Sequence, residues 1–404
     1  MLNTAALLIP VFLLIVLFEW YISYKSHNNR YTTANTTMNL TIGAIDQIVS
    51  LASFALLFIV MEYMYNHYRI VHVENIWYQW IGGYIAVDFL SYWYHRWSHR
   101  INILWAGHIT HHSSEHFNFS NGFRTSPLQG INRIVFWALL PVFGFSPVAL
   151  ILIFKISGLF DFLQHTEYIP KLKYIDKILV TPSAHRVHHG RNEKYIDKNY
   201  GSNFIIWDKL FGTYQEETEK VNYGITSSYK DINPLSAIGF HYQYMWNTIK
   251  AARRWQDKIK VPFMPPEWKP EIIEAVNMPE HKVSTTISKQ ENRYAWFQLA
   301  ACTTGIITLL AYYNYLTYGQ IMLLSIIAIS EMSNVTMIFN KSIAAKFEKR
   351  ELTRILLGII LILISLYLWP NKFIWIVLVY LFISFFLIFP YRNKTDHFSD
   401  AFPA

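Results

Sequence analysis

Long apolar runs constrain the fold of this chain more than any other feature of its sequence. A helix needs about 20 mostly apolar residues to cross the hydrocarbon core of a bilayer. Runs of this kind occupy 4–22, 41–65, 76–94, 295–313, 320–339, 353–369 and 373–390. Two shorter runs, 131–143 and 147–163, are divided by Pro141 and Pro147 and predict a hairpin that enters and leaves the membrane on one side. The expected fold class is an all-α, polytopic integral-membrane helical bundle.

The composition also favours a membrane protein. Hydrophobic residues make up 52% of the 404 residues and charged residues 15%, against about 25% charged residues in an average soluble domain. The single cysteine, Cys302, excludes an intrachain disulfide and a cysteine-based zinc finger. Although the net charge is +8, the chain has no lysine- and arginine-rich run and no nucleic-acid-binding motif. We therefore expect no nucleic-acid partner.

Basic residues between the apolar runs predict the orientation of the chain. Lys25 and Arg30 follow the first run without an acidic residue, and the loop 340–352 is rich in lysine, whereas the loop 314–319 carries no charge. The positive-inside rule then places these segments on the cytoplasmic side: 23–39, 95–130, 164–292, 340–352 and the C-terminus. The run Ala5–Phe18 lacks the basic start and the cleavage site of a signal peptide. We interpret it as a retained anchor, in a bacterial inner membrane or the endoplasmic reticulum.

Histidines form the second unusual pattern. Ten of the 16 histidines lie between positions 95 and 189. They include one H-x3-H motif, His95–His99, and two H-x2-H-H motifs, His108–His112 and His185–His189. Because residues three and four apart share one face of a helix, we expect each motif to aim its imidazoles at one point. Imidazole is the commonest metal ligand in proteins, and all three motifs fall on one predicted face of the membrane.

The number of these histidines predicts two metal ions. One ion takes about three to six ligands, fewer than the motif histidines and the isolated His165 together provide. The candidate ligands are His95, His99, His108, His111, His112, His165, His185, His188 and His189. His116 lies close to them but outside the pattern. We interpret the remaining histidines as solvated or hydrogen-bonded side chains: His27, His67, His72, His241, His281 and His397.

The motifs favour iron. A zinc hydrolase typically carries a carboxylate base in an H-E-x-x-H motif, which is absent here, and no haem-attachment or nucleotide-binding motif is present. Two irons held mainly by histidine at a membrane face fit the activation of O2 beside a lipid chain. A histidine-rich metal transporter is the alternative from a different class, but its ionisable groups would lie at mid-bilayer in broken helices.

Four stretches around the histidines resemble one group of enzymes: WAGHITHHSSE (105–115), TPSAHRVHHGRN (181–192), YIDKNYG (195–201) and IWDKLFGT (206–213). They are similar to the fatty acid hydroxylase/sterol desaturase superfamily of integral-membrane non-haem di-iron enzymes, and more closely to its alkylglycerol monooxygenase branch. The resemblance covers about 84–216. It implies that the nine candidate histidines ligate two Fe ions.

The resemblance also implies an O2-dependent monooxygenase acting on a lipid substrate. In that branch the target is the carbon next to the ether oxygen of an alkylglycerol lipid. Hydroxylation there gives a hemiacetal, which collapses to a fatty aldehyde and a glycerol derivative. The branch uses tetrahydrobiopterin as reductant, and a redox protein stays open as the electron donor because no residue of this chain indicates a pterin site. The alternative within the superfamily is a hydroxylase or desaturase of fatty acyl, sterol or carotenoid chains.

Three positions depart from the pattern of that branch. Arg100 stands where animal members carry glutamate, Ala184 where they carry a further histidine, and Asp161 where they often carry glutamine. The first departure weakens the transfer of the exact substrate and electron donor. Asp161 and His165 share a helix face, so we expect Asp161 to be a partner of the site rather than a ligand.

Metal-bound imidazoles need a partner for their second ring nitrogen. The candidates for orienting the histidines or the substrate are Asp88, Glu115, Asp161, Glu167 and Asn192. Asp88 lies inside an apolar run, where an unpaired carboxylate is costly. Asp197 and Asn199, like Asn192, either orient the last ligands or form turns. Arg186 and Arg191 either contact a polar head group or are solvated.

The chain divides into four expected regions. Residues 1–75 form N-terminal spans, and 76–216 form a fatty-acid-hydroxylase-type core with the histidine motifs. Residues 217–292 form a cytosolic polar cap or linker in which the proline-rich segment 262–270 predicts irregular structure. Residues 293–404 form C-terminal spans, for which a scaffold is the simplest expectation.

Overall fold

The fold is built from helices. The computed structural model describes residues 4–226, 233–272, 276, 289–336, 347–368 and 372–395. In these segments the chain forms α-helices, short 3-10 turns, one π-helical turn and isolated β-bridges, and none of them contains a β-strand. The predicted all-α class is therefore confirmed. His281, His397, Lys341 and Lys346, on which parts of the sequence interpretation rest, lie outside the described residues.

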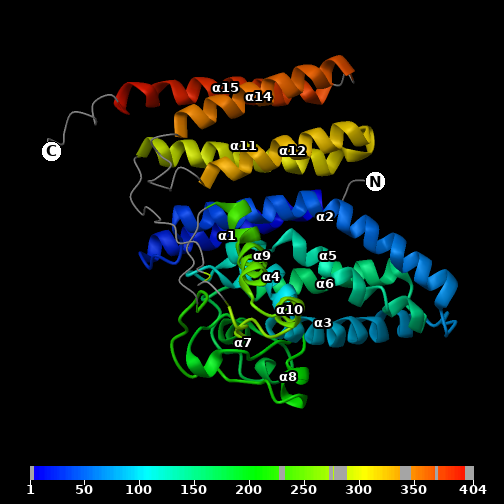
Figure 1. The fold of residues 1–404 in the computed structure, drawn as a ribbon. Helices are drawn as coiled ribbons and strands as arrows, with labels where there is room; N and C mark the ends of the chain where they lie inside the picture. The colour runs from blue at the N-terminus through cyan, green and yellow to red at the C-terminus, as the bar shows by residue number, and fades with distance from the viewer. Residues whose placement is uncertain are drawn as a thin grey trace.

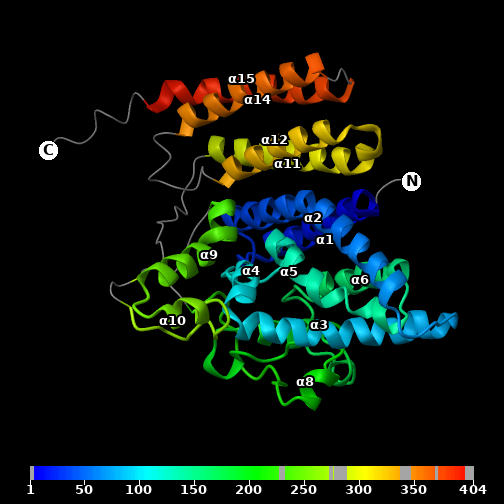
Figure 2. The ribbon, with the colours of Figure 1, turned by 45° about the vertical axis from the view of Figure 1, so that its right-hand side comes forward.

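The long helices stack in layers. Two pairs lie side by side (Figure 1): α11 (Lys289–Tyr312) with α12 (Tyr318–Val335), and α14 (Phe347–Leu368) with α15 (Lys372–Thr395). α1 (Thr4–Ser26) and α2 (Thr33–Tyr68) form the next layer, and both contact α11. On the other side of α2 lie α5 (Pro127–Trp137), α6 (Pro147–Leu163) and α3 (Gly83–Arg100). The short helix α8 (Ile206–Leu210) lies beyond α3 in both views (Figure 2), and α7 (Pro182–His188) lies on the same side of the bundle in Figure 1. The C-terminal layers are thus separated from α7 and α8 by the rest of the bundle.

Several of these helices are suited to a bilayer. Within the described residues, three are long and apolar enough to cross it, at Leu8–Ser26, Thr33–Tyr68 and Asn292–Tyr315. α3 is not among them, because it carries Asp88 in its first half and Arg96, Arg100 and the two histidines of the first motif in its second half. α2 has 36 residues and is therefore about 54 Å long, which exceeds the thickness of the hydrocarbon core. The chain is a multi-pass membrane protein.

The hairpin of α5 and α6 begins and ends at the end of the bundle that carries the histidines. Its turn reaches the loop between α2 and α3 at the opposite end, where the Ile70 N–H donates to the Val142 carbonyl (2.9 Å) and the Gln79 amide donates to the Gly144 carbonyl (2.8 Å). Gly144 has φ +86°, and a Cβ there would lie 2.5 Å from the Val71 carbonyl oxygen. Only glycine satisfies both conditions without strain.

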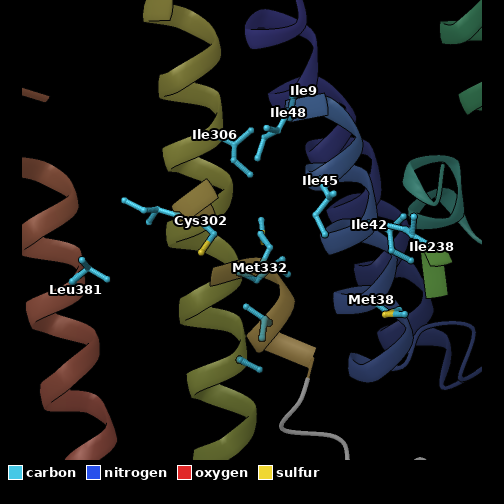
Figure 3. Packing of buried hydrophobic residues seen from close by; sticks show 14 of the residues in the cluster. Ile9, Met38, Ile42, Ile45, Ile48, Ile238, Cys302, Ile306, Met332 and Leu381 are labelled. Carbon is cyan, nitrogen blue, oxygen red and sulfur yellow. The ribbon is translucent and has the colours of Figure 1, made fainter. Parts of the chain in front are cut away.

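A buried apolar cluster joins the N-terminal spans to the C-terminal layers. Residues of α1, α2, α9, α11, α12 and α15 contribute to it (Figure 3): Ile9, Met38, Ile42, Ile45, Ile48, Ile238, Cys302, Ile306, Met332 and Leu381. Lipid tails are as apolar as these side chains, so close packing rather than exclusion of water holds such helices together.

A buried polar network connects the four C-terminal helices. Arg354 pairs with Glu331 and Glu351, and the Tyr380 hydroxyl donates to Glu331 (2.7 Å). The Tyr294 hydroxyl, from α11, donates to Glu351 (2.5 Å). Charges inside a membrane persist only when they are paired. These contacts therefore specify how the C-terminal helices pack against one another.

Helix α9 (Pro234–Ala251) packs against α4 (Asn102–His112), which carries one histidine motif. The Thr110 hydroxyl donates to the Ala237 carbonyl (2.9 Å), and the His241 ring bonds to the Asn102 side-chain oxygen (2.7 Å). His241 is thus a hydrogen-bonded side chain. The region interpreted as a cap or linker from sequence supports the site directly.

Acid is expected to weaken this packing through His241. Burial lowers the pKa of His241 from 6.5 to about 4, and its Nδ1 is buried with no hydrogen-bond partner among the described residues. Between these values the unfolded chain binds a proton that the folded chain excludes. The free energy of unfolding therefore falls as the pH falls from 6.5 towards 4, by up to about 3 kcal/mol.

Thermal unfolding of the wild type and of His241→Gln in nanodiscs, at about pH 7.5 and about pH 5, tests this expectation. Glutamine keeps an amide donor for Asn102 but does not titrate, so its midpoint should fall less in acid. An equal fall in both proteins would contradict the role of His241.

Candidate metal centre

Three helices and one loop bring the nine candidate histidines together. They come from α3, α4, α7 with the residue that follows it, and the loop after α6. One group contains His95, His99, His108, His112 and His188. The other contains His111, His165, His185 and His189. Within each group the candidate ligand atoms lie within 4.8 Å of one another, and the groups adjoin where the rings of His112 and His189 stack at 4.4 Å.

The structure corrects one expectation about the motifs. Each H-x2-H-H motif was expected to aim at one point, but each divides between the two groups. His108 and His112 enter the first group while His111 enters the second; His185 and His189 enter the second while His188 enters the first. Helical spacing of about 100° per residue explains the division, because positions i and i+4 lie closer in direction to each other than to i+3.

Backbone carbonyls set the tautomer of four of these histidines. The paired atoms are His95 Nδ1 with Tyr200 O (2.9 Å), His188 Nδ1 with Lys198 O (2.9 Å), His165 Nδ1 with Asp161 O (2.9 Å) and His111 Nδ1 with Arg124 O (3.3 Å). A carbonyl only accepts, so Nδ1 carries the proton in each ring. In the neutral imidazole, Nε2 then presents a lone pair.

The Nε2 atoms of the histidines in each group lie close to one another. In the first group, Nε2 of His108 lies 3.0 Å from Nε2 of both His95 and His112. In the second group, Nε2 of His165 lies 3.0 Å from that of His185 and 3.3 Å from that of His111. The Nε2 lone pairs of His165 and His111 form no hydrogen bond with each other, so a cation between them would stabilise the arrangement.

Protonation of the histidine rings does not supply that cation. Burial lowers the pKa of His165 from 6.5 to about 4 and that of His188 to about 3. It lowers the pKa of His108 and His185 well below 6.5, and neighbouring histidines lower both further. The rings are therefore neutral near pH 7, which is the form that ligates metals. His99 Nε2 is also buried without a hydrogen-bond partner in the described segments, as expected of an available ligand atom.

Asp88 supports the histidines indirectly, by binding a loop that contacts one of them. Its carboxylate accepts hydrogen bonds from the backbone N–H groups of Asn203 (2.8 Å) and Phe204 (3.2 Å) and from the Trp207 indole (2.7 Å). It thereby holds on α3 the loop that contains Tyr200, whose carbonyl pairs with His95. The sequence suggested that Asp88 contacts a histidine, whereas its contacts are with this loop.

Sequence reasoning missed three supporting residues. Asp208 accepts from the N–H groups of Tyr200 (2.7 Å) and Gly201 (2.8 Å). The Gln129 side chain pairs with His108 Nδ1 (3.0 Å). Arg124 donates to the Thr110 carbonyl (2.8 Å) and lends its own carbonyl to His111. Polar residues inside or beside the apolar hairpin were the available signal for Gln129 and Arg124.

The other predicted partners lie around the site rather than on the rings. The Asp161 carboxylate accepts from the Ser202 hydroxyl (2.8 Å), so its main chain, and not its side chain, pairs with His165. Glu167 pairs with Arg30 (3.1 Å). The Asn192 side chain donates to the Lys220 carbonyl (3.0 Å), which gives it a loop-forming role.

Glu115 and the two arginines are also placed away from the rings. The Glu115 side chain lies beside Gly224, and Arg191 approaches the same glycine. Arg186 is buried and makes a bidentate pair with Glu217 at 2.9 and 2.8 Å. Neither suggestion for Arg186, contact with a head group or solvation, is therefore correct.

Asp197 is the carboxylate that lies against a candidate ligand. Its Oδ1 lies 3.5 Å from His99 Nδ1, and its Oδ2 lies 3.1 Å from the Arg100 guanidinium. Burial raises the pKa of Asp197, but His99 and Arg100 outweigh burial and hold it below 3.8. Arg100, a departure from the family pattern, thus helps to keep this carboxylate ionised. Asp197 also has φ +59° and Asn199 φ +54°, so both are turn residues as well.

Replacing Asp197 with alanine is expected to weaken metal binding by roughly 10- to 100-fold, the usual effect of losing a carboxylate behind a histidine ligand. Arg100→Gln removes the ion pair but keeps the carboxylate beside His99, so its effect should be smaller. Competition with a chelator, followed by metal analysis, gives both affinities. Equal affinities in Asp197→Ala and wild type would contradict the orienting role.

A cavity of about 350 Å³ opens beside the histidines. Its walls include residues of α2, α3, α5 and α6. Both groups contribute to it, with His95 and His108 from the first and His111, His165 and His185 from the second. A ligand in this cavity would lie between membrane helices and against the candidate metal centre.

Comparisons with known proteins cover the same region. The family described as fatty acid hydroxylase matches residues 80–213, which include all nine histidines. Alkylglycerol monooxygenase of Homo sapiens is 36% identical over 266 residues, covering 65% of this chain and 59% of that protein. The Danio rerio protein of the same name is 30% identical over 322 residues, covering 78% of this chain and 71% of that protein. Ornithine lipid hydroxylase of Rhizobium tropici is 30% identical over 145 residues, covering 34% and 42%.

No solved structure matches this chain. The chain spans 59% and 58% of the Homo sapiens and Xenopus tropicalis proteins that it matches. It nevertheless covers 71% of the Danio rerio protein, and the fatty acid hydroxylase match contains both groups of histidines. By this extent of similarity, the chain belongs to the alkylglycerol monooxygenase family.

Proposed function

We propose that this chain is a membrane-embedded, O2-dependent di-iron monooxygenase that hydroxylates a lipid at the carbon next to an ether oxygen. One observation supports the proposal most strongly. In two adjoining groups of neutral histidines, neighbouring Nε2 atoms lie 3.0 to 3.3 Å apart, beside a cavity between membrane helices. Nine neutral nitrogen donors suit iron, and the first group of five and second group of four suit one ion each.

Iron bound to these histidines would activate O2 so that one oxygen atom enters a C–H bond and the other leaves as water. The chain's own residues hold the rings and shape the cavity. The carbonyls of Tyr200, Lys198, Asp161 and Arg124 fix the ring orientations. Burial between membrane helices keeps bulk water away from the reacting carbon, which favours a productive lipid pose over side reactions.

The reaction needs two electrons for each oxygen atom inserted. We propose tetrahydrobiopterin as their source, on the strength of family membership, with a redox protein as the alternative donor. Omitting each in turn from an assay of purified protein in nanodiscs separates them. Turnover with a redox protein and without the pterin would reject the pterin.

We also propose that the site faces the cytoplasm. The basic loop after α1 packs on the histidine-bearing loops, because Arg30 pairs with Glu167 (3.1 Å) and its carbonyl accepts from the Asn118 side chain (2.8 Å). Positively charged loops lie on the cytoplasmic side of bacterial inner membranes and the endoplasmic reticulum. Labelling of a cysteine introduced at exposed Lys194 in sealed vesicles of known orientation tests this assignment.

Metal analysis and product analysis together test the activity. We expect about two irons per chain, and release of labelled fatty aldehyde from an alkylglycerol with O2 and reduced tetrahydrobiopterin. Oxidation of acyl or sterol lipids instead would favour the other branches of the superfamily. Metal flux across a vesicle without O2 consumption would favour the transporter. One zinc per chain would reject the di-iron centre.

A further inference from the structure

The cavity beside the histidines has a polar wall that lies inside a membrane-spanning helix. Asp46, Gln47, Ser50 and Ser53 of α2 line it. Asp46, Ser50 and Ser53 are spaced i, i+4 and i+7, so they follow one face of the helix over about 10 Å. A cavity that accepts only a hydrocarbon chain has no use for such a wall, and an ionisable side chain in a span is costly unless it has a function.

Asp46 is the member of this wall whose carboxylate is left without a close cation. Its neighbour Gln47 donates to it at 3.5 Å, at the limit of a hydrogen bond. No lysine or arginine of the described residues lies within 4.0 Å of its oxygens. Arg133 of α5 acts on this carboxylate through space, without an ion pair. Asp46 is half-buried and therefore keeps acceptor capacity directed at the cavity.

The Arg133 guanidinium makes cation–π contacts with aromatic rings instead. Its guanidinium lies 5.6 Å from the centre of the Tyr94 ring and 5.9 Å from that of Trp137, and both rings line the cavity as well. The same cavity is therefore lined by the Asp46 carboxylate, the Arg133 guanidinium, two serines and histidines of the candidate metal centre. This set of groups is suited to a small hydroxylated ligand.

We infer that Asp46 is a specificity-determining residue that accepts hydrogen bonds from the hydroxyl groups of a neutral, polyol lipid head group. The inference rests on the proposed function for the reacting carbon, and it assigns the other end of the same substrate. A carboxylate has two oxygens and binds two adjacent hydroxyls well, with Ser50 and Gln47 beside it. A head group held there leaves the first carbon of the chain facing the histidines within the same cavity.

In its ionised form, Asp46 would also exclude a class of ligands. A phosphorylated head group would bring a second negative charge into a cavity of low dielectric, where like charges repel strongly. Arg133 would offset this repulsion only by leaving its aromatic neighbours.

Binding and turnover of matched lipids test the inference. The probes are a 1-O-alkylglycerol, its analogue with both hydroxyls methylated, and its 3-phosphate, each with a photoreactive group in the chain. We expect Asp46→Asn and Asp46→Leu to raise KM for the free diol by roughly 10- to 100-fold, the effect of losing charge-assisted hydrogen bonds, with a smaller change in kcat. The methylated analogue should bind weakly to the wild type and equally weakly to both variants.

Glu62→Gln is the matched control, because Glu62 is a carboxylate of the same helix that does not line the cavity. Equal losses for the diol and the methylated analogue in the Asp46 variants would overturn the inference in favour of a structural role. Tighter binding of the 3-phosphate than of the diol, lost in Arg133→Gln, would also overturn it. Photolabelling needs no turnover, so diol-selective labelling that depends on Asp46 would stand even if no aldehyde were formed.

Discussion

Replacing His111 with alanine is expected to abolish the proposed activity and to lower the bound iron. His111 joins the second group through its Nε2, 3.3 Å from that of His165, and that group has only four members. Loss of an outer partner of a ligand commonly costs 10- to 100-fold, so loss of the ligand itself should cost at least roughly 100-fold in rate. Metal analysis of purified protein and aldehyde release give the two readouts.

Two further variants make this result specific. His112→Ala removes the adjacent residue, which belongs to the first group, so each single variant should lose one ion and the double variant both. His116→Ala changes a histidine outside both groups and should keep the metal. Unchanged iron and activity in His111→Ala would contradict its role as a ligand.

Replacing Asp88 with alanine is expected to destabilise the protein and empty the metal centre. Three buried donors, the N–H groups of Asn203 and Phe204 and the Trp207 indole, would lose their acceptor. Each unsatisfied donor costs about 1 to 3 kcal/mol, so the loss should reach about 3 to 5 kcal/mol. The released loop carries Tyr200, whose carbonyl then no longer orients His95.

Thermal unfolding in nanodiscs and iron content measure this effect. Asp88→Asn keeps one acceptor oxygen and should lose less stability than Asp88→Ala. Glu193→Ala, at an exposed carboxylate, should change neither quantity. A wild-type midpoint together with full iron content in Asp88→Ala would show that the loop is held by other contacts.

The amino-acid pattern predicts the helices well because a membrane helix requires a long run of apolar residues. Every apolar run became helical where it lies in the described residues, and the hairpin broken at Pro141 and Pro147 formed. The limits of α3 were harder to predict. Its helix continues from the apolar run 76–94 to Arg100, because His95 and His99 contact histidines of α4 and α7, which hydropathy does not indicate.

In the candidate site, too, some residues could be predicted from sequence and others could not. The imidazole side chain is rare and the motif spacing is regular, so His95, His108 and His185 could all be identified from sequence. The partners of the rings could not, because most are backbone carbonyls. Every residue has a carbonyl, and only the path of the loop through Tyr200 and Lys198 brings two of them to His95 and His188.

The sequence by itself determined which segments are helical and which histidines form motifs, because both depend on spacing along a single helix. Only the tertiary structure decided how the histidines divide into groups of five and four, since His111 and His188 each leave the other members of their own motif. It also decided that Asp46, an isolated acidic residue in an apolar run, lines the same cavity as His111. These relations join residues far apart in the chain, and they exist only once helices α2, α4 and α7 have packed.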